Sequence, residues 1–115
     1  MTTVRMTGGE ALVRALGPEN VPFVFGVAGG KLLRFMHALS QQQAIRYVGV
    51  RHEASAAMMA AATYAASGRI AVAMGEVGPG AINLLAGMGN AYNNNLAVFA
   101  LTSNNQLAAS YPALP

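Results

Sequence analysis

The chain contains neither cysteine nor aspartate, and it carries few charges of either sign. Without cysteine there is no disulfide framework and no thiolate chemistry, and the first residues lack the apolar core of a secretory signal, so we expect a cytoplasmic location. Without aspartate, a divalent-metal site would depend on Glu, Asn, His or carbonyl ligands. We therefore expect this chain alone to hold no metal ion.

Charged residues make up only 10% of the 115 residues, whereas hydrophobic residues make up 54%. The last charged residue is Glu76, so residues 77–115 carry no formal charge. This is more apolar surface than one small domain needs for its own core, and it predicts that other protein covers part of the chain. Gly78-Pro79-Gly80 and a run of asparagines at 93–95 interrupt the uncharged segment, so no apolar run of ~20 residues is available to span a membrane.

The net charge of +3 reflects a scarcity of acids, because the seven basic residues are scattered along the chain. A dispersed charge of this kind argues against nucleic-acid binding. The two histidines, His37 and His52, have no second histidine or cysteine nearby in sequence, so zinc binding is not supported.

Hydrophobic patterning predicts four strands separated by helices. The expected strands are 23–27, 45–50, 70–74 and 96–102; the expected helices follow a capping box at 7–10 and then cover 31–40, 54–66 and 81–92, with a turn at 76–80. Apolar, partly β-branched strands that alternate with helices indicate an α/β fold. We expect one domain over residues 1–115, a doubly wound, mostly parallel sheet with helices on both faces.

Unusual residues follow each predicted strand, at the edge where parallel sheets bind ligands. They are Ala28-Gly29-Gly30, Glu53, Gly78-Pro79-Gly80 and Asn104. Glycines at such places let a ligand or a partner backbone approach closely. For any single one of them, ordinary turn chemistry is an equally good interpretation.

Glu53 is the only acid between Glu19 and Glu76, and it stands between a predicted strand and a predicted buried helix. A carboxyl group shielded from water favours its protonated form, which suits proton exchange with a ligand. The alternative is an acid that interacts with the helix dipole and pairs with Arg51 or His52. This segment alone does not separate the two roles.

Three motifs occur in a defined order: Phe25-Gly26-Val27-Ala28-Gly29-Gly30, Arg51-His52-Glu53 and Gly78-Pro79-Gly80-Ala81-Ile82-Asn83. With this order and spacing, the chain from about Thr7 to Asn105 resembles the N-terminal pyrimidine-binding domain of thiamine-diphosphate enzymes. The most similar group comprises acetolactate synthase, benzoylformate decarboxylase and pyruvate oxidase. Each motif is weak alone, but the ordered set is specific.

The resemblance implies that Glu53 is the catalytic residue. Its carboxyl group would hydrogen-bond to the aminopyrimidine ring of thiamine diphosphate, at the ring nitrogen opposite the exocyclic amine, and would so promote loss of the thiazolium C2 proton. The cofactor then attacks the carbonyl of a 2-oxo acid and accepts electrons during decarboxylation or carbon–carbon bond cleavage or transfer.

The resemblance also assigns roles to the residues around Glu53. It implies cofactor binding by Gly29, Gly30, Gly78, Pro79, Gly80 and Asn83, with Asn83 supporting the turn, and places Ala28 and Asn104 near the substrate. Family members often have proline at the position of Ala28 and glutamine at that of Asn104. They usually have Gly-Tyr where this chain has Ala62-Thr63.

The family holds Mg²⁺ and the diphosphate with an Asp and Asn motif of a second domain, and this chain has no such motif. We therefore expect an incomplete pyrimidine-binding domain that acts only with a diphosphate-binding domain or subunit, which supplies the Mg²⁺ site. A homodimer or tetramer is expected. Nothing in the sequence indicates a flavin.

Small and flexible residues are frequent in the two predicted helices 54–66 and 81–92, among them Met58, Met59, Gly87 and Gly89. Such helices can approach another helix closely. Two interpretations remain open, a dimer interface and an ordinary intradomain core. The alternative to a catalytic half-site is a non-catalytic dimerisation or regulatory module with the same fold.

Overall fold

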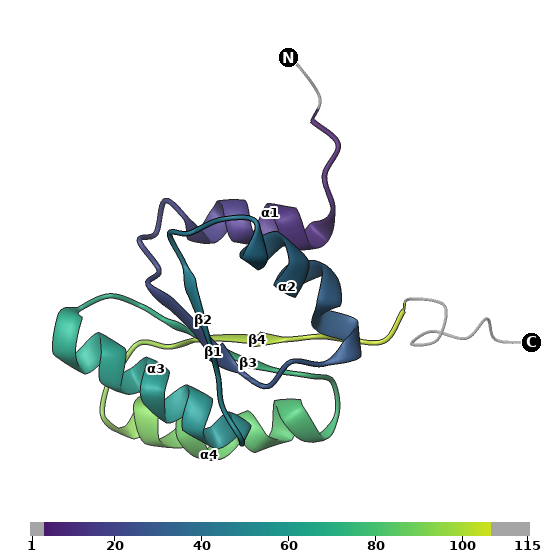
Figure 1. Ribbon diagram of the computed structural model, residues 1–115. Helices are drawn as coiled ribbons and strands as arrows, with labels where there is room; N and C mark the ends of the chain where they lie inside the picture. The colour runs from purple at the N-terminus through teal and green to yellow at the C-terminus, as the bar shows by residue number, and fades with distance from the viewer. Residues whose placement is uncertain (1–3, 107–115) are drawn as a thin grey trace, which may run out of the picture.

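The computed structural model describes residues 4–106, which form a four-stranded sheet between two pairs of helices (Figure 1). In chain order the elements are α1 (Gly8–Leu16), β1 (Phe23–Gly26), the 3₁₀ helix η1 (Gly30–Leu32), α2 (Leu33–Ser40), β2 (Arg46–Gly49), α3 (Glu53–Ser67), β3 (Val72–Gly75), α4 (Pro79–Asn93) and β4 (Phe99–Thr102). The predicted alternation of strands and helices is confirmed.

All strand pairs are parallel, and the order across the sheet is β2-β1-β3-β4. Val24 of β1 lies beside Tyr47 of β2 on one side and Val72 of β3 on the other. The chain therefore moves outward from β1 to β2 and returns to the opposite side of β1. The loops after β1 and β3 diverge at this switch point, where sheets of this type bind ligands.

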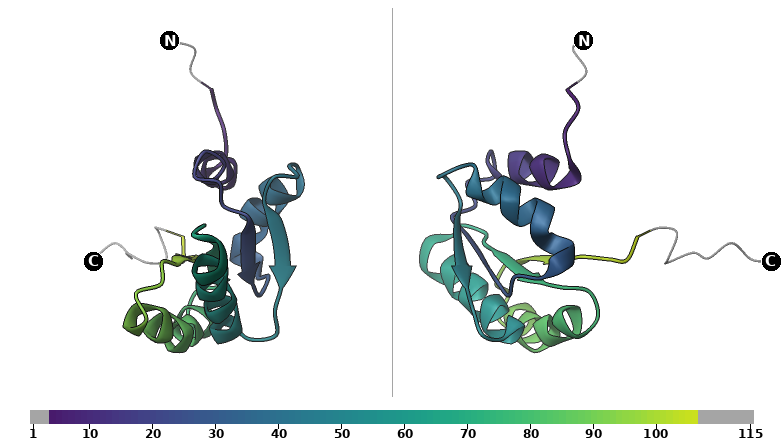
Figure 2. Two further views of the ribbon diagram at one scale, coloured as in Figure 1. Left: turned by 90° about the vertical axis from the view of Figure 1, so that its left-hand side faces the viewer. Right: turned by 45° about the vertical axis from the view of Figure 1, so that its right-hand side comes forward.

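Helices cover both faces of the sheet, as expected for the doubly wound α/β class. Figures 1 and 2 show α1 and α2 on one side and α3 and α4 on the other. Strand side chains alternate between the two layers: Val24, Val72 and Met74 belong to the core beneath α1 and α2, whereas Phe25 and Ala73 belong to the core beneath α3 and α4.

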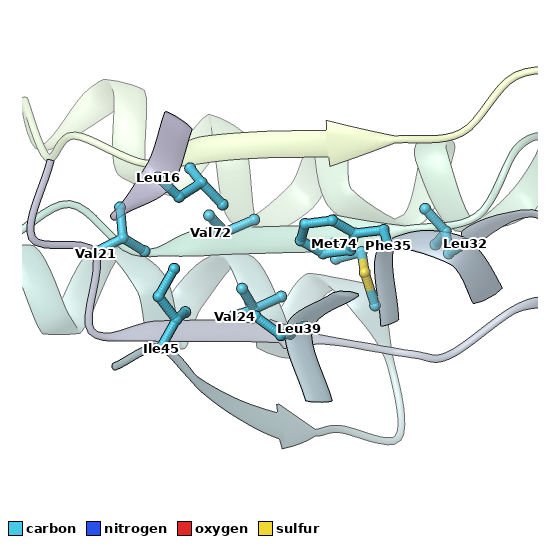
Figure 3. Close-up of a cluster of buried hydrophobic side chains, with 9 residues drawn as sticks. All are labelled: Leu16, Val21, Val24, Leu32, Phe35, Leu39, Ile45, Val72 and Met74. Atoms are coloured by element: carbon cyan, nitrogen blue, oxygen red, sulfur yellow. The ribbon is translucent and has the colours of Figure 1, made fainter. Parts of the chain in front are cut away.

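The two cores differ in the size of their side chains. The core under α1 and α2 contains large residues, which Figure 3 shows: Leu16, Val21, Val24, Leu32, Phe35, Leu39, Ile45, Val72 and Met74. The other core is rich in alanine, with Ala56, Ala57 and Ala60 fully buried. Small side chains bring α3 close to the sheet and to α4, and the first residue of α3 is Glu53.

Gly87 and Gly89 have different surroundings in α4. A Cβ on Gly87 would lie 2.5 Å from both the carbonyl oxygen of Ala54 and Cβ of Ala57, whereas one on Gly89 would meet nothing within 4 Å. Intradomain packing of α3 on α4 therefore explains Gly87. Gly89 has no such explanation among the described residues.

Local signals define several helix ends as predicted. Thr7 and Glu10 form the expected capping box, with Thr7 N donating to Oε2 of Glu10 (2.6 Å) and Glu10 N donating to Oγ1 of Thr7 (3.2 Å). Helix α3 ends at Gly68, which adopts a left-handed conformation with φ of 69°.

Several predicted boundaries differ from those of the structure. Helix α4 begins at Pro79 rather than near residue 81, because proline is suited to the first helical position and Gly78, with φ of 80°, makes the turn before it. The last strand covers only Phe99–Thr102, since it pairs with the four residues of β3, which itself lies at 72–75 rather than 70–74. The helix expected over 31–40 starts as the 3₁₀ turn η1.

Candidate functional site

The parallel sheet places four chain segments at its carboxyl edge. Ala28-Gly29-Gly30 follows β1, Glu53 follows β2, Gly78-Pro79-Gly80 follows β3 and Asn104 follows β4. Parallel strands all end at the same edge, so these segments share one rim of the molecule. Within this rim, side-chain contacts separate a group around Glu53 from a second group around Gly30.

Glu53 is the first residue of α3, and its side chain points inward. Only 9% of its surface is exposed, and it is the buried charged residue of the core. The preceding His52 caps the helix instead, since its Nδ1 accepts a hydrogen bond from the backbone N–H of Ala54 (3.2 Å). The helix dipole favours an acid at this position.

Asn83 is the hydrogen-bond partner of Glu53. Its Nδ2 donates to Oε2 of the carboxyl group across 2.9 Å, from the second turn of α4. Neither Arg51 nor His52 forms an ion pair or a hydrogen bond with Glu53, although the structure describes all three residues. Asn83, which we expected to support the turn after β3, thus orients the carboxyl group directly.

The second carboxyl oxygen, Oε1, accepts no hydrogen bond from the described residues. Gly80 lies beside it, and a Cβ on Gly80 would stand 3.1 Å from Oε1 and 3.3 Å from the backbone carbon of Gly75. Oε1 therefore faces Gly80, which has no side chain, while Asn83 holds Oε2. This arrangement suits a ligand that carries a nitrogen donor or acceptor.

The turn between β3 and α4 shapes the wall beside Glu53. Gly78 has the left-handed φ of 80°, Pro79 begins the helix, and the backbone N–H of Ala81 donates to the carbonyl oxygen of Glu76 (2.8 Å). Gly78 and Pro79 are exposed, whereas Gly80 is buried against Gly75. Gly80 is the member of this motif that contacts the carboxyl group.

Glu76 is a residue of this edge that sequence reasoning missed. Its Oε1 accepts the backbone N–H of Lys31 (2.6 Å), and its carboxylate packs where a side chain on Gly29 would lie. Glu76 thereby links the loop after β3 to the loop after β1. The signal was available, because Glu76 follows β3 as Glu53 follows β2, and acids are scarce in this chain.

Two further side chains fix the ends of the strands. The hydroxyl of Tyr47 donates to the carbonyl oxygen of Gly26 (3.0 Å), and burial raises the pKa of this tyrosine. Oγ of Ser103 accepts the backbone N–H of Val77 (2.9 Å). These contacts hold the loops after β1 and β3 against their neighbouring strands.

Ala28 and Asn104, the two residues predicted near the substrate, are both exposed. Asn104 lies with Gly30 in a surface pocket and accepts the backbone N–H of Asn105 (2.8 Å) through its own Oδ1. No hydrogen bond joins Asn104 to Glu53 or Asn83, all of which the structure describes. The residues expected to share one rim therefore form two groups at the same edge of the sheet, one around Glu53 and one around Gly30.

The described residues form neither a cluster of metal ligands nor a membrane-spanning helix. Residues 4–106 bring no group of three or more His, Cys, Asp or Glu side chains together around a metal position. The same range holds no helix that combines the length and apolar character needed to cross a lipid bilayer.

The fold is an α/β domain with a buried carboxyl group at the carboxyl edge of its parallel sheet. The family described as thiamine pyrophosphate enzyme, N-terminal TPP binding domain, matches residues 6–111. The chain belongs to this family.

Similar proteins of known sequence include acetolactate synthases and a pyruvate oxidase. A probable acetolactate synthase large subunit of Methanococcus aeolicus is 41% identical over 97 residues, which is 84% of this chain and 16% of that protein. A pyruvate oxidase of Lactiplantibacillus plantarum is 37% identical over 94 residues, 81% of this chain and 16% of that protein. Acetolactate synthase isozyme 1 large subunit of Escherichia coli is 35% identical over 101 residues, 88% of this chain and 18% of that protein. The chain spans less than a fifth of the length of these relatives.

Proposed function

We propose that the chain is the pyrimidine-binding half of a thiamine-diphosphate-dependent enzyme that acts on a 2-oxo acid or a related carbonyl compound. The reaction would be a decarboxylation or a carbon–carbon bond cleavage or transfer, and it would require a diphosphate- and Mg²⁺-binding domain or subunit. The supporting observation is the Glu53 carboxyl group, which is buried; Asn83 binds its Oε2, and its Oε1 faces Gly80 without a hydrogen bond from the described residues.

The residues around Glu53 fit an aminopyrimidine ring. Oε1 can share a proton with a ring nitrogen, and Asn83 fixes the direction in which the carboxyl group points. Gly80 lies close to Oε1, and a Cβ at this position would stand 3.1 Å from that oxygen, so a side chain here would crowd the carboxyl group. Thiamine diphosphate, when bound, supplies the electron-accepting ring that bond cleavage next to a carbonyl requires. The task of this chain is to hold or move one proton at Glu53.

An uncovered apolar surface supports the proposal that the chain works with a partner. The outer faces of α3 and α4 expose Met58 (46%), Met59 (39%), Ile82 (66%), Leu85 (64%) and Tyr92 (88%). Exposed apolar residues grouped on adjacent helices are typical of protein–protein contacts. A diphosphate-binding subunit, or a second copy in a homodimer or tetramer, would cover them.

The same surface also favours the second candidate, a non-catalytic dimerisation or regulatory module. The two candidates differ in whether Glu53 acts on a cofactor. In the first, thiamine diphosphate with Mg²⁺ binds when this chain and the diphosphate-binding partner are both present. In the second, this chain binds the partner but does not change the affinity of the partner for the cofactor.

Glu53→Gln in the assembled enzyme tests the catalytic role. We expect turnover to fall by about 10²- to 10⁴-fold, the range that one proton-transferring group contributes, while assembly is retained. Glu19→Gln, which removes an exposed carboxylate, is the matched control and should leave turnover unchanged. Unchanged turnover in Glu53→Gln would remove Glu53 from the mechanism. Calorimetry with thiamine diphosphate and Mg²⁺ that shows equal binding with and without this chain would favour the module.

A further inference from the structure

A polar surface pocket of about 510 Å³ lies at the same edge of the sheet as the proposed cofactor site. One wall is the turn from Gly30 into α2, which contributes Lys31 and Arg34; the opposite wall is the segment after β4, residues 104–106. The pocket therefore lies between two loops of the carboxyl edge, one on each side of β3.

The charged side chains that line this pocket, Lys31 and Arg34, are both cations. Lys31 and Arg34 are three residues apart, so they project from neighbouring positions of one helical turn. Asn104, Asn105 and Gln106 add amide groups opposite them, and none of the described lining residues is acidic. Glu76 does not line the pocket, but its carboxylate lies close by, where Oε1 accepts the backbone N–H of Lys31 (2.6 Å) and offsets part of the positive charge.

Cations and amides that face one another across a pocket are suited to an acceptor-rich anion. Charge-assisted hydrogen bonds from ammonium and guanidinium groups are about twice as strong as neutral ones, and guanidinium binds carboxylate or phosphate through two N–H groups. Two cations complement a ligand with two negative charges better than a ligand with one negative charge. A volume of about 510 Å³ accommodates a small organic acid.

We propose that this pocket binds a small dianion, through Lys31 and Arg34 on one side and the amides of residues 104–106 on the other. Its position at the same edge of the sheet as the proposed cofactor site makes it the place for an acidic group at the far end of a substrate; that assignment rests on the proposed function. The substrate would then carry a second acidic group in addition to the one beside its reacting carbonyl. Anion binding itself depends only on the pocket.

Nuclear magnetic resonance titration of the ¹⁵N-labelled full chain tests the proposal. Succinate and inorganic phosphate serve as dianions and acetate as the monoanion, all at equal ionic strength so that general screening is constant. We expect shifts in the backbone amides of residues 30–34 and 104–106, and roughly tenfold tighter binding of succinate than of acetate. Stronger binding of phosphate than of succinate would point to a phosphorylated substrate, and the reverse to a dicarboxylate.

Lys31→Met and Arg34→Met should each weaken succinate binding by roughly tenfold. Arg14→Met removes the same charge from the exposed face of α1 and should leave binding unchanged. Lys31→Met keeps the backbone hydrogen bond to Glu76, so it remains a valid test if Arg34→Met fails to fold. Absence of shifts, or equal weakening by all three variants, would overturn the proposal. Failure of the Glu53→Gln test with succinate binding intact would overturn only the assignment to a substrate.

Discussion

Asn83 donates a hydrogen bond to Glu53 across 2.9 Å and 30 positions of sequence, and this contact joins α4 to the first residue of α3. The alanine-rich packing of the two helices brings the side chains together. Because Asn83 binds Oε2, the orientation of the carboxyl group is fixed, and with it the position of Oε1. The two residues come from different helices, so only the folded chain brings them together.

Asn83→Ala should impair both stability and activity. The substitution leaves the buried carboxyl group of Glu53 without its described partner, which costs about 1–3 kcal/mol in the free energy of unfolding. Turnover of the assembled enzyme should fall as well, because the carboxyl group loses its orientation. Chemical denaturation and turnover measure the two effects. Asn93→Ala, at the exposed end of α4, is the control, and equal behaviour of the two variants would contradict the role of Asn83.

Alanine at Gly87 and at Gly89 of α4 should have opposite effects on stability. Gly87→Ala places a Cβ against Ala54 and Ala57, and overpacking of this kind lowers the free energy of unfolding by about 1–3 kcal/mol. Gly89→Ala meets open space and gains helix propensity, so it should raise the free energy of unfolding by up to about 1 kcal/mol. Urea denaturation measures both, and a stabilised Gly87→Ala would show that the helices pack less closely than described.

Glu76→Gln should loosen the loop after β1. The backbone N–H of Lys31 then donates to a neutral amide instead of a carboxylate, and its hydrogen exchange should accelerate by up to about tenfold. Exchange in α1 should stay unchanged, as should exchange at Lys31 in the control variant Glu19→Gln. If the Lys31 amide exchanges at the same rate in Glu76→Gln, the carboxylate does not hold this loop.

Tyr47 should make stability depend on alkaline pH. Burial raises its pKa in the folded chain, so its contribution is fully present below the unfolded pKa near 10 and is lost as the pH rises through the higher folded value. Tyr47→Phe should remove this dependence and cost about 1 kcal/mol at neutral pH through loss of the bond to Gly26. Denaturation midpoints between pH 7 and pH 11 provide the measurement, and parallel curves for both proteins would contradict the expectation.

Element types were predictable because their signals lie within a few adjacent residues. The capping box of Thr7 and Glu10, the glycine that ends α3 at Gly68 and the four apolar strands all depend on local backbone preferences and side-chain period. The start of α4 was predicted wrongly although its signal was local: Pro79 suits a first helical position, and we had assigned it to a turn.

Contacts between distant segments were not predictable in the same way. No local pattern states that Glu76 binds the backbone of Lys31, 45 positions away, or that Asn83 faces Glu53 rather than the turn. The resemblance to thiamine-diphosphate enzymes singled out Glu53, Gly80 and Asn83. It left open how they contact one another.

The order of residues thus specified the class of fold, the helix and strand types and the family, since these follow from hydrophobic period, capping and short motifs. The strand order β2-β1-β3-β4, the burial of Glu53 and the close approach of Gly80 to its carboxyl group arose only on folding. They depend on which faces bury one another and how closely small side chains allow helices to approach. Those are properties of packing between segments, and no single stretch of the chain contains them.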